Sequence, residues 1–212
     1  MKLLSSLAFL FVLSLSCNQA SQKEKVTEVK PGNGDSITAQ KAEPGTNPYA
    51  GIDISPMDMS YYPVDYPKLK MTNSISTPPL VRVIYSRPHL QGRHLFHEVL
   101  KYDEPWRLGA NESSEIDFYN DVTIQGKKIK AGRYVIYCIP HPGQWSIVLN
   151  SNIDSWGLQQ DATKDIARFV IPVQETSNHL EYYTMVFEKK DAGAELVMAW
   201  DNLEARLAIS FQ

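Results

Sequence analysis

The sequence predicts an all-β protein: an antiparallel β-sandwich of jelly-roll-like type with an extended N-terminal arm and at most one short helix. The first observation is that short, alternating apolar segments recur from residue 80 to the end of the chain, with turn residues between them. The second is the segment 133–139, in which both alternating sets of side chains are apolar. A strand that is apolar on both faces is usually covered on both faces, so this segment is expected at the centre of a sheet.

Turn residues next to the central segment predict two hairpins. Residues 140–143, Pro-His-Pro-Gly, follow it and lead into a strand at 145–149 with Trp145 on its inward face. Gln125-Gly126 separates two shorter apolar segments and predicts the second hairpin.

The remaining strands follow at regular spacing. Pro172 indicates an edge strand or a bulge. Residues 154–166 alone have a pattern compatible with a helix, and Trp156-Gly157 near their start keeps that helix short. The expected strands cover residues 167–173, 182–188, 195–200 and 205–211.

The first 16 residues have the form of a secretory signal peptide. Lys2 precedes an apolar run over residues 3–15. A membrane-crossing helix needs about 20 apolar residues, and this run is shorter and interrupted by serines. We therefore expect residues 1–16 to be removed on export.

Cys17 directly follows this run. The order Leu-Ser-Leu-Ser-Cys over residues 13–17 resembles the lipobox of bacterial lipoproteins, which predicts that Cys17 is acylated. Ordinary cleavage that leaves a free thiol is the alternative. The sequence has 2 cysteines, so an acylated Cys17 leaves Cys138 without a partner for an intramolecular disulfide. Cys138 lies in an apolar strand and is expected to act as a small hydrophobic residue.

The segment between the signal peptide and the strands has two parts. Residues 17–48 have almost no large apolar side chain, which predicts a disordered, lipid-anchored tether or a tail without a role. Residues 49–79 combine aromatic side chains and methionines with repeated prolines, which are expected to exclude a helix. We interpret 49–79 as an extended arm across the domain, or alternatively as an aromatic cluster that binds a ligand. Residues 49–212 are expected to form a single domain.

The charge of the chain gives no general attraction to polyanions. The formal net charge is −3 at pH 7. Neither nucleic acid nor anionic lipid is therefore implied as a partner, and contact with a membrane is expected through the lipid anchor alone.

The stretch 85–115 is the candidate site because charged and aromatic side chains gather there without regular periodicity. Arginine offers a planar fork that suits carboxylate or phosphate oxygens, and tryptophan offers a flat face for a sugar ring. These residues predict a pocket for a small anionic or saccharide ligand. The alternative is structural, with Arg107 and Glu112 as an ion pair and Trp106 closing the end of the sandwich. The candidate ligand-binding residues are Arg87, Arg93, Trp106, Arg107, Asn111 and Glu112.

Catalytic and metal-binding interpretations of the same stretch are weaker. His89, His94, His97 and Glu98 are not arranged as HExxH, and Pro88 and Gly92 disfavour the helix that would align them. A catalytic triad could combine Ser86 with one of these histidines and with Asp103 or Glu112 as the acid. Ser86, however, lacks the Gly-x-Ser-x-Gly motif, whose strained turn exposes a nucleophilic serine. Glu112 with Glu115 or Asp117 lacks the separation across a cleft that a glycosidase needs. No catalytic residue, metal or cofactor is therefore assigned.

Several separated motifs resemble those of a known family and follow one another in the same order. The resemblance is to the DUF2911 family, a domain family of unknown function, and covers roughly residue 54 to the end. It implies an exported or lipid-anchored protein, mostly found in Bacteroidota, and supplies no activity. His94 and His97 depart from the family pattern. The motifs are Tyr85-Ser86-Arg87-Pro88, Gly92-Arg93 with Phe96, residues 106–112, Asp121-Val122, residues 130–134, Ile139-Pro140, Trp145, Asn150 and Trp156-Gly157.

Together these patterns predict a lipid-anchored protein at the periplasmic face or cell surface of a Gram-negative envelope. Its expected function is non-catalytic binding of an anionic or saccharide ligand near Arg87, Arg107 and Glu112. An envelope hydrolase that uses the Arg107/Glu112 region and a structural scaffold subunit of an envelope complex remain open. The sequence does not indicate an oligomeric state.

Overall fold

The structure, a computed structural model, describes residues 53–211. The signal peptide, Cys17 and the tether lie outside the described residues. Within them the chain forms mostly antiparallel strands, which confirms the all-β class, while the jelly-roll-like detail stays a prediction. The strands are β1 (Met57–Tyr62), β2 (Val81–Ser86), β3 (Glu115–Phe118), β4 (Val122–Ile124), β5 (Lys127–Ile129), β6 (Gly132–His141), β7 (Gln144–Asn150), β8 (Asp165–Lys190) and β9 (Gly193–Phe211).

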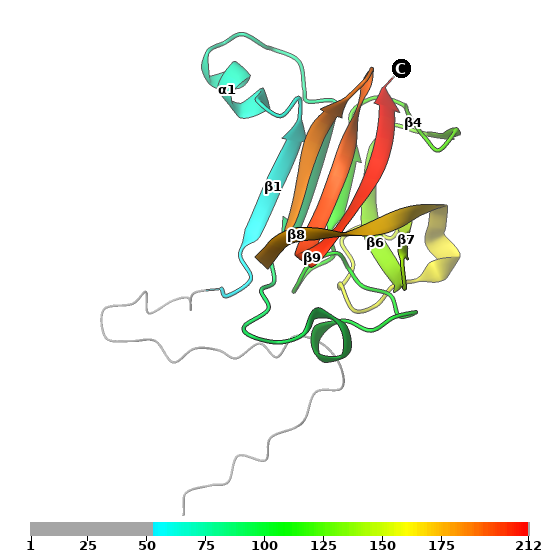
Figure 1. Cartoon of the computed structure of the whole chain (residues 1–212). Coiled ribbons are helices and arrows are strands. Elements are labelled where there is room, and N and C mark those ends of the chain that lie inside the picture. Colours follow the sequence, from blue (N-terminus) through cyan, green and yellow to red (C-terminus); the bar gives the residue numbers. More distant parts are fainter. Residues whose placement is uncertain (1–52, 212) are drawn as a thin grey trace, which may run out of the picture. The chain divides into compact units, whose positions relative to one another are not determined.

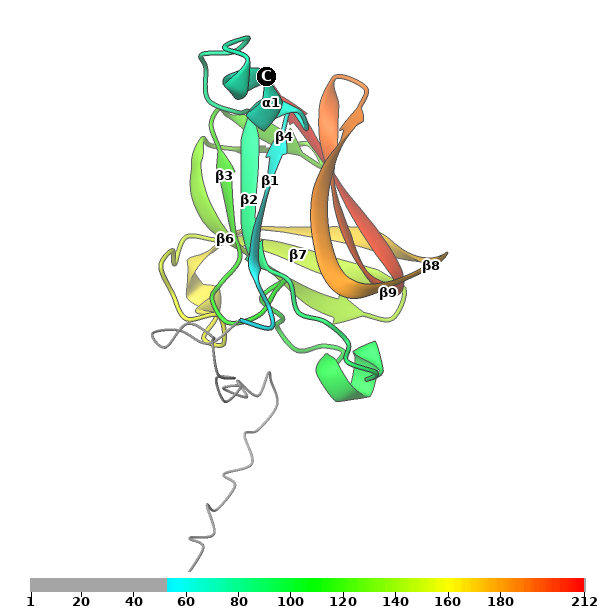
Figure 2. The same ribbon diagram turned by 90° about the vertical axis from the view of Figure 1, so that its left-hand side faces the viewer.

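The nine strands hydrogen-bond in the order β1-β2-β3-β6-β7-β8-β9-β4-β5. The strand β8 links two parts of this sheet, because its first residues pair with β7 up to Pro172 and the following residues pair with β9 from Val173 onward. Figures 1 and 2 show β8 curving from one part of the sheet into the other. The inner faces of the two parts therefore face each other.

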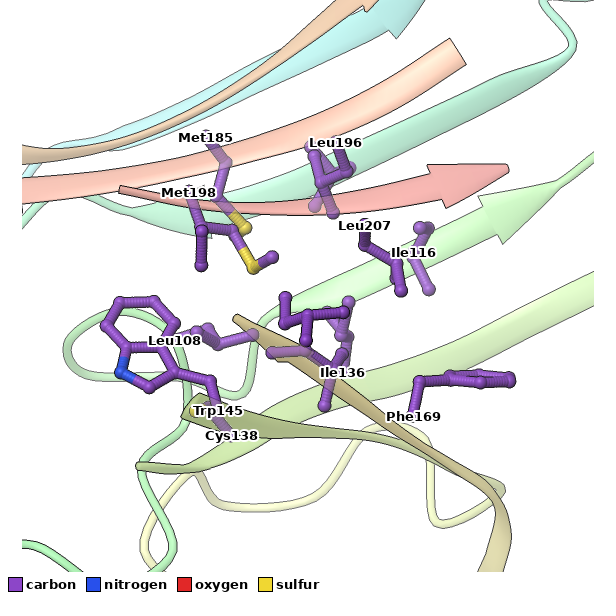
Figure 3. Packing of buried hydrophobic residues seen from close by; sticks show 14 of the residues in the cluster. Leu108, Ile116, Ile136, Cys138, Trp145, Phe169, Met185, Leu196, Met198 and Leu207 are labelled. Atoms are coloured by element: carbon purple, nitrogen blue, oxygen red, sulfur yellow. The ribbon is translucent and has the colours of Figure 1, made fainter. Parts of the chain in front are cut away.

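The core lies between these inner faces. Figure 3 shows Ile136, Cys138 and Phe169 on one side and Met185, Leu196 and Met198 on the other. The strand β6, predicted to be central, has β3 and β7 as its neighbours, which confirms the prediction. Its side chains from Val135 to Cys138 are buried.

Both predicted hairpins are confirmed. Antiparallel pairing joins β6 to β7, with His141 opposite Gln144. It also joins β4 to β5, with Ile124 opposite Lys127 around the two-residue turn Gln125-Gly126. Gln125 and Gly126 have φ of 47° and 77°, the left-handed values that a tight hairpin turn requires.

The predicted strands 167–173 and 182–188 are two ends of the single strand β8, and 195–200 and 205–211 are two parts of β9. The polar residues 174–179 interrupt the apolar alternation, but the backbone there stays extended, and its register with β9 shifts between Glu175 and Thr184. Pro172, expected at an edge or a bulge, lies where β8 changes its partner from β7 to β9.

The helices differ from expectation. The prediction that prolines exclude a helix from residues 49–79 is wrong, because α1 (Tyr66–Met71) is a helix with Pro67 in its first turn. A first-turn proline is tolerated, since its missing N–H has no partner within the helix at that position. Part of the expected arm is the edge strand β1, paired with β2. In residues 154–166 the only helical element is the 3₁₀ turn η2 (Ala162–Lys164).

Two long connections meet at the end of the sheets opposite α1. One runs from β2 to β3 and includes the irregular turn η1 (Leu95–Val99); the other runs from β7 to β8. Figures 1 and 2 show both at this end, in green and yellow respectively. The first connection contains all six candidate binding residues.

Candidate functional site

Two short pairings fasten the β2–β3 connection to the sheets. His89 forms an isolated bridge with Tyr182, and Trp106 forms one with Cys138. The Trp106 N–H donates to the Cys138 carbonyl at 2.7 Å, and the Cys138 N–H donates back at 2.8 Å. The connection is therefore anchored to β8 near its start and to the central strand β6 near its end.

Trp106 is a core residue. It is 8% exposed, and its ring lies 4.8 Å from that of Tyr183, 5.7 Å from that of Trp145 and 5.8 Å from that of Trp200. Its indole N–H donates to the Gly109 carbonyl at 3.3 Å. These contacts support the structural interpretation of Trp106, as the side chain that closes this end of the sheets.

Arg107 is buried beside a pocket. Only 6% of the residue is exposed, and it lines a cavity of about 120 Å³ together with parts of both connections and Trp200. The other charged or titratable residues that line this cavity are His97, Glu98, Lys101 and Glu104. The pocket therefore joins a buried guanidinium to a mouth of mixed charge.

The backbone after Arg107 turns sharply. Leu108 has φ of 52°, a left-handed value that is uncommon for a bulky residue. The Ser114 hydroxyl donates to the Leu108 carbonyl at 2.8 Å and holds this turn. A Cβ on Gly109 would lie 2.9 Å from Ser114 Oγ and 3.0 Å from the Ser86 carbonyl oxygen, so only glycine fits there.

Gly157 brings the β7–β8 connection into contact with Arg107. A Cβ at position 157 would lie 2.4 Å from Arg107 Cδ, 2.9 Å from the Asn111 carbonyl oxygen and 3.0 Å from the Glu112 carbonyl carbon. Gly157 and Leu158 also line the pocket. The two connections are therefore packed as closely as a glycine permits.

Arg107 has a partner within the chain, and the ion pair expected between Arg107 and Glu112 stays a prediction. Glu112 is exposed. Asn111 has φ of 60°, and its side-chain amide donates to Asp53 at 3.2 Å. Neither Asn111 nor Glu112 lines the Arg107 pocket.

Arg87 lies in a different depression. It lines an open groove of about 420 Å³ with His89 and Tyr182, whereas its neighbour Pro88 lines the Arg107 pocket. Its guanidinium donates to the Tyr183 carbonyl at 3.2 Å and to Thr184 Oγ1 at 3.0 Å, and it pairs with Asp58 at 3.3 Å. The structure thus separates Arg87 from Arg107.

Arg93 stabilises its own loop. Its Nε donates to the Leu90 carbonyl at 2.8 Å, and its Nη2 donates to the His89 carbonyl at 2.9 Å. Arg93 lines neither depression. Of the six candidates, the structure therefore brings together Trp106 and Arg107 in one pocket.

The pocket contains residues that the sequence interpretation did not select. Lys101 pairs with Glu104 at 3.4 Å at the mouth. Leu158 and Gly157 come from a connection about fifty residues away in the sequence. The motif Trp156-Gly157 was visible in the sequence, but nothing local indicates that it lies against Arg107.

The groups weighed for catalysis or metal binding are dispersed. Ser86 is buried and ends β2. The His141 imidazole, and not one of the three histidines of the candidate stretch, hydrogen-bonds to Asp103. His89 lies 3.6 Å from Glu181. Within residues 53–211, no group of three or more His, Cys, Asp or Glu side chains is placed to hold a metal ion.

Burial is the main cause of the raised pKa values of three core residues, Cys138, Tyr183 and Tyr85. It raises the pKa of the Cys138 thiol and of the Tyr183 phenol well above their usual ranges. It also raises the pKa of Tyr85 to about 12, although the Met185 N–H donates to that phenolic oxygen at 2.8 Å and opposes the shift. These groups are therefore neutral at physiological pH.

No helix in the described part of the chain is long and apolar enough to span a membrane. Neither the curated proteins nor the solved structures contain a significant match to the chain. The sequence profile of one family, described as "Protein of unknown function (DUF2911)", matches residues 67–209. This match covers more than half of the chain and includes both connections that form the pocket, so the chain belongs to the DUF2911 family.

Proposed function

We propose that this protein is a non-catalytic binding module whose Arg107 pocket receives the anionic group of a small ligand. The observation that carries the proposal is the burial of Arg107 at the wall of a cavity. A guanidinium carries five N–H donors, so Arg107 can hold an oxyanion in addition to its partner within the chain. A carboxylate or phosphate in the pocket would meet donors in a fixed, planar arrangement.

The size of the pocket limits what enters it. Sites that enclose a whole drug-sized ligand measure roughly 300–1,000 Å³. The Arg107 cavity measures about 120 Å³, which suits a single carboxylate or phosphate group. The remainder of the ligand would then lie outside the cavity, across the surface at its mouth.

Titration calorimetry on the full-length protein tests this function. The probes are inorganic phosphate, glucuronate and neutral glucose, in a buffer free of other oxyanions. The expected result is saturable binding of the two anions with one site per chain. Because Lys101 is at the mouth and exposed, Lys101→Glu should fold normally and weaken anion binding by about threefold to tenfold.

Lys128→Glu is the matched control, since it makes the same charge change on an exposed residue of β5 that does not line the pocket. It should leave anion binding within about twofold of the wild type. Equal effects of the two lysine variants, or no binding of either anion to the wild type, would rule out the proposed pocket.

We also propose that the protein is exported and held in the cell envelope by a lipid on Cys17. The support is the apolar run over residues 3–15, the lipobox-like sequence before Cys17 and the polar segment after it. Metabolic labelling with an alkyne fatty acid in a Gram-negative host should label the wild type and not Cys17→Ser. Equal labelling of both proteins would refute acylation at this cysteine.

A further inference from the structure

The loop between β7 and η2 exposes three large apolar side chains close together in the sequence. Ile153 is 39% exposed, Trp156 is 58% exposed and Leu158 is 56% exposed. Single exposed apolar residues are ordinary on a protein surface, but a tryptophan is usually mostly buried because its ring is large and apolar. Three such side chains in one loop therefore indicate a contact with something outside the chain.

The backbone of this loop is held in place by the rest of the domain. Ser113 Oγ donates to the Ser155 carbonyl at 2.9 Å, and the Gln159 N–H donates to the Trp156 carbonyl at 3.0 Å. Gly157 packs directly on the β2–β3 connection. The loop is thus preorganised, so a contact with its apolar side chains costs little conformational entropy.

The loop lies near the point where the described chain begins. Asp53 is the first described residue, and it accepts a hydrogen bond from the Asn111 side-chain amide at 3.2 Å. The Asn111 carbonyl oxygen lies 2.9 Å from the position that a Cβ on Gly157 would take. Figures 1 and 2 show the start of β1 in cyan and the loop after β7 in yellow at the same end of the sheets. The tether predicted from the sequence therefore joins the domain at the end that carries the exposed loop.

The charges of the loop bear on the kind of surface that it contacts. Residues 152–161 include two aspartates and no lysine or arginine. Asp154 pairs with Arg133 at 2.7 Å, and Asp161 pairs with Lys164 at 3.8 Å. Proteins that are drawn to anionic lipids use clusters of basic side chains, which this loop lacks. Its apolar side chains and paired carboxylates suit a zwitterionic lipid surface instead.

The small size of the exposed loop also favours a lipid surface over a protein partner. A stable protein interface uses about 20–30 residues a side, far more than this loop exposes. Tryptophan is enriched where a bilayer meets water, because its ring is apolar and its N–H is polar. A domain that is already tethered to a bilayer needs only a small further contact, since the tether keeps the local concentration of lipid high.

We propose that Ile153, Trp156 and Leu158 insert into the headgroup region of a zwitterionic bilayer and orient the tethered domain on the membrane. This inference rests on the proposed anchoring through Cys17, which brings the domain to the bilayer. It adds a contact made by the folded domain to the lipid anchor that the sequence predicts.

Quenching of tryptophan fluorescence by lipids with brominated acyl chains tests the contact. The chain 17–212 with Cys17→Ser keeps every described residue and has no acyl chain of its own. Because the other three tryptophans are buried, a change in emission on adding vesicles reports mainly on Trp156. Brominated phosphatidylcholine should quench the wild-type loop and leave the emission of Trp156→Phe almost unchanged. The buried tryptophans are Trp106, Trp145 and Trp200.

Trp156→Ala should weaken partitioning of the same chain into vesicles of phosphatidylethanolamine and phosphatidylcholine by about threefold to thirtyfold. Because Trp156 does not line the Arg107 pocket, this variant should bind phosphate as the wild type does. Met71→Ala is the matched control, since it removes a side chain that is 79% exposed on α1, at the opposite end of the sheets. It should leave partitioning within about twofold of the wild type.

The outcomes separate this inference from the proposed anchor. If brominated lipid does not quench the wild-type emission, or if Trp156→Ala partitions like the wild type, the membrane contact is refuted even where Cys17 is acylated. If quenching occurs but Cys17 carries no lipid, the anchor fails and the contact stands. Quenching that needs phosphatidylglycerol and disappears at high salt would show electrostatic attraction in place of apolar insertion, and would overturn the proposal.

Discussion

Replacement of Gly157 by alanine tests the contact between the β2–β3 and β7–β8 connections, because the contact decides whether the free energy of unfolding rises or falls. At a position without strain, Gly→Ala stabilises a protein by about 0.4–1 kcal/mol, because it restricts the unfolded chain. Gly157 is not among the glycines with positive φ, so the backbone itself accepts alanine. Any destabilisation must therefore come from the atoms that the new methyl group meets.

The geometry predicts destabilisation. The new Cβ would lie 2.4 Å from Arg107 Cδ and 2.9 Å from the Asn111 carbonyl oxygen, whereas ordinary contact begins near 3.4 Å. The side chain of Arg107 can shift, but the backbone of Asn111 yields less easily. Overpacking of this kind costs about 1–3 kcal/mol. After the entropic gain is subtracted, we expect a net loss of about 1–2 kcal/mol.

Urea unfolding followed by far-ultraviolet circular dichroism measures this free energy, and the expected fall in Tm is about 2 to 8 °C for a chain of this length. Gln159→Ala, an exposed substitution in the same loop, is the control and should change stability by less than about 0.5 kcal/mol. A Gly157→Ala variant more stable than the wild type would show that the loop does not pack on Arg107 as described.

Three further results are expected. Trp106→Ala should cost about 3–5 kcal/mol in urea unfolding, because it removes the ring packed among Trp145, Tyr183 and Trp200; a loss below about 1 kcal/mol would contradict its structural role. Burial raises the pKa of Tyr85 to about 12, so the stability that its neutral phenol contributes is complete below pH 10 and is lost as the pH rises from 10 through 12. Urea unfolding at pH 9 and at pH 11.5 should therefore show a smaller loss of stability in Tyr85→Phe than in the wild type. In a Cys17→Ser protein the buried Cys138 thiol should react with Ellman's reagent only after unfolding, and rapid reaction of the native protein would refute its burial.

The parts of the fold that follow from local pattern were predictable. Both sets of apolar side chains in β6 indicate a central strand, and Gln125-Gly126 has the turn chemistry of a two-residue hairpin. The continuity of β8 was not predictable, because residues 174–179 are polar while their backbone stays extended. The helix α1 was missed because a proline in the first turn was treated like one in the helix interior.

The sequence indicated which segment contains the candidate site, but not which residues line the pocket. Adjacent residues of an extended chain point in opposite directions, so Arg87 faces the groove near Tyr182 while Pro88 faces the Arg107 pocket. Gly157 and Leu158 reach the pocket through tertiary packing of a distant connection, which no spacing in the sequence encodes. The site therefore depends on contacts that only the folded chain reveals.

The side-chain resonance of Arg107 tests the central proposal most directly. The ¹⁵Nε–¹Hε signal of Arg107 in the full-length protein can be assigned by its disappearance in Arg107→Lys, and then followed as glucuronate is added. The pocket predicts a saturable shift of this signal, with the same dissociation constant that calorimetry gives. A signal that stays in place while glucuronate binds, as calorimetry would show, would mean that Arg107 is not the residue that holds the anion.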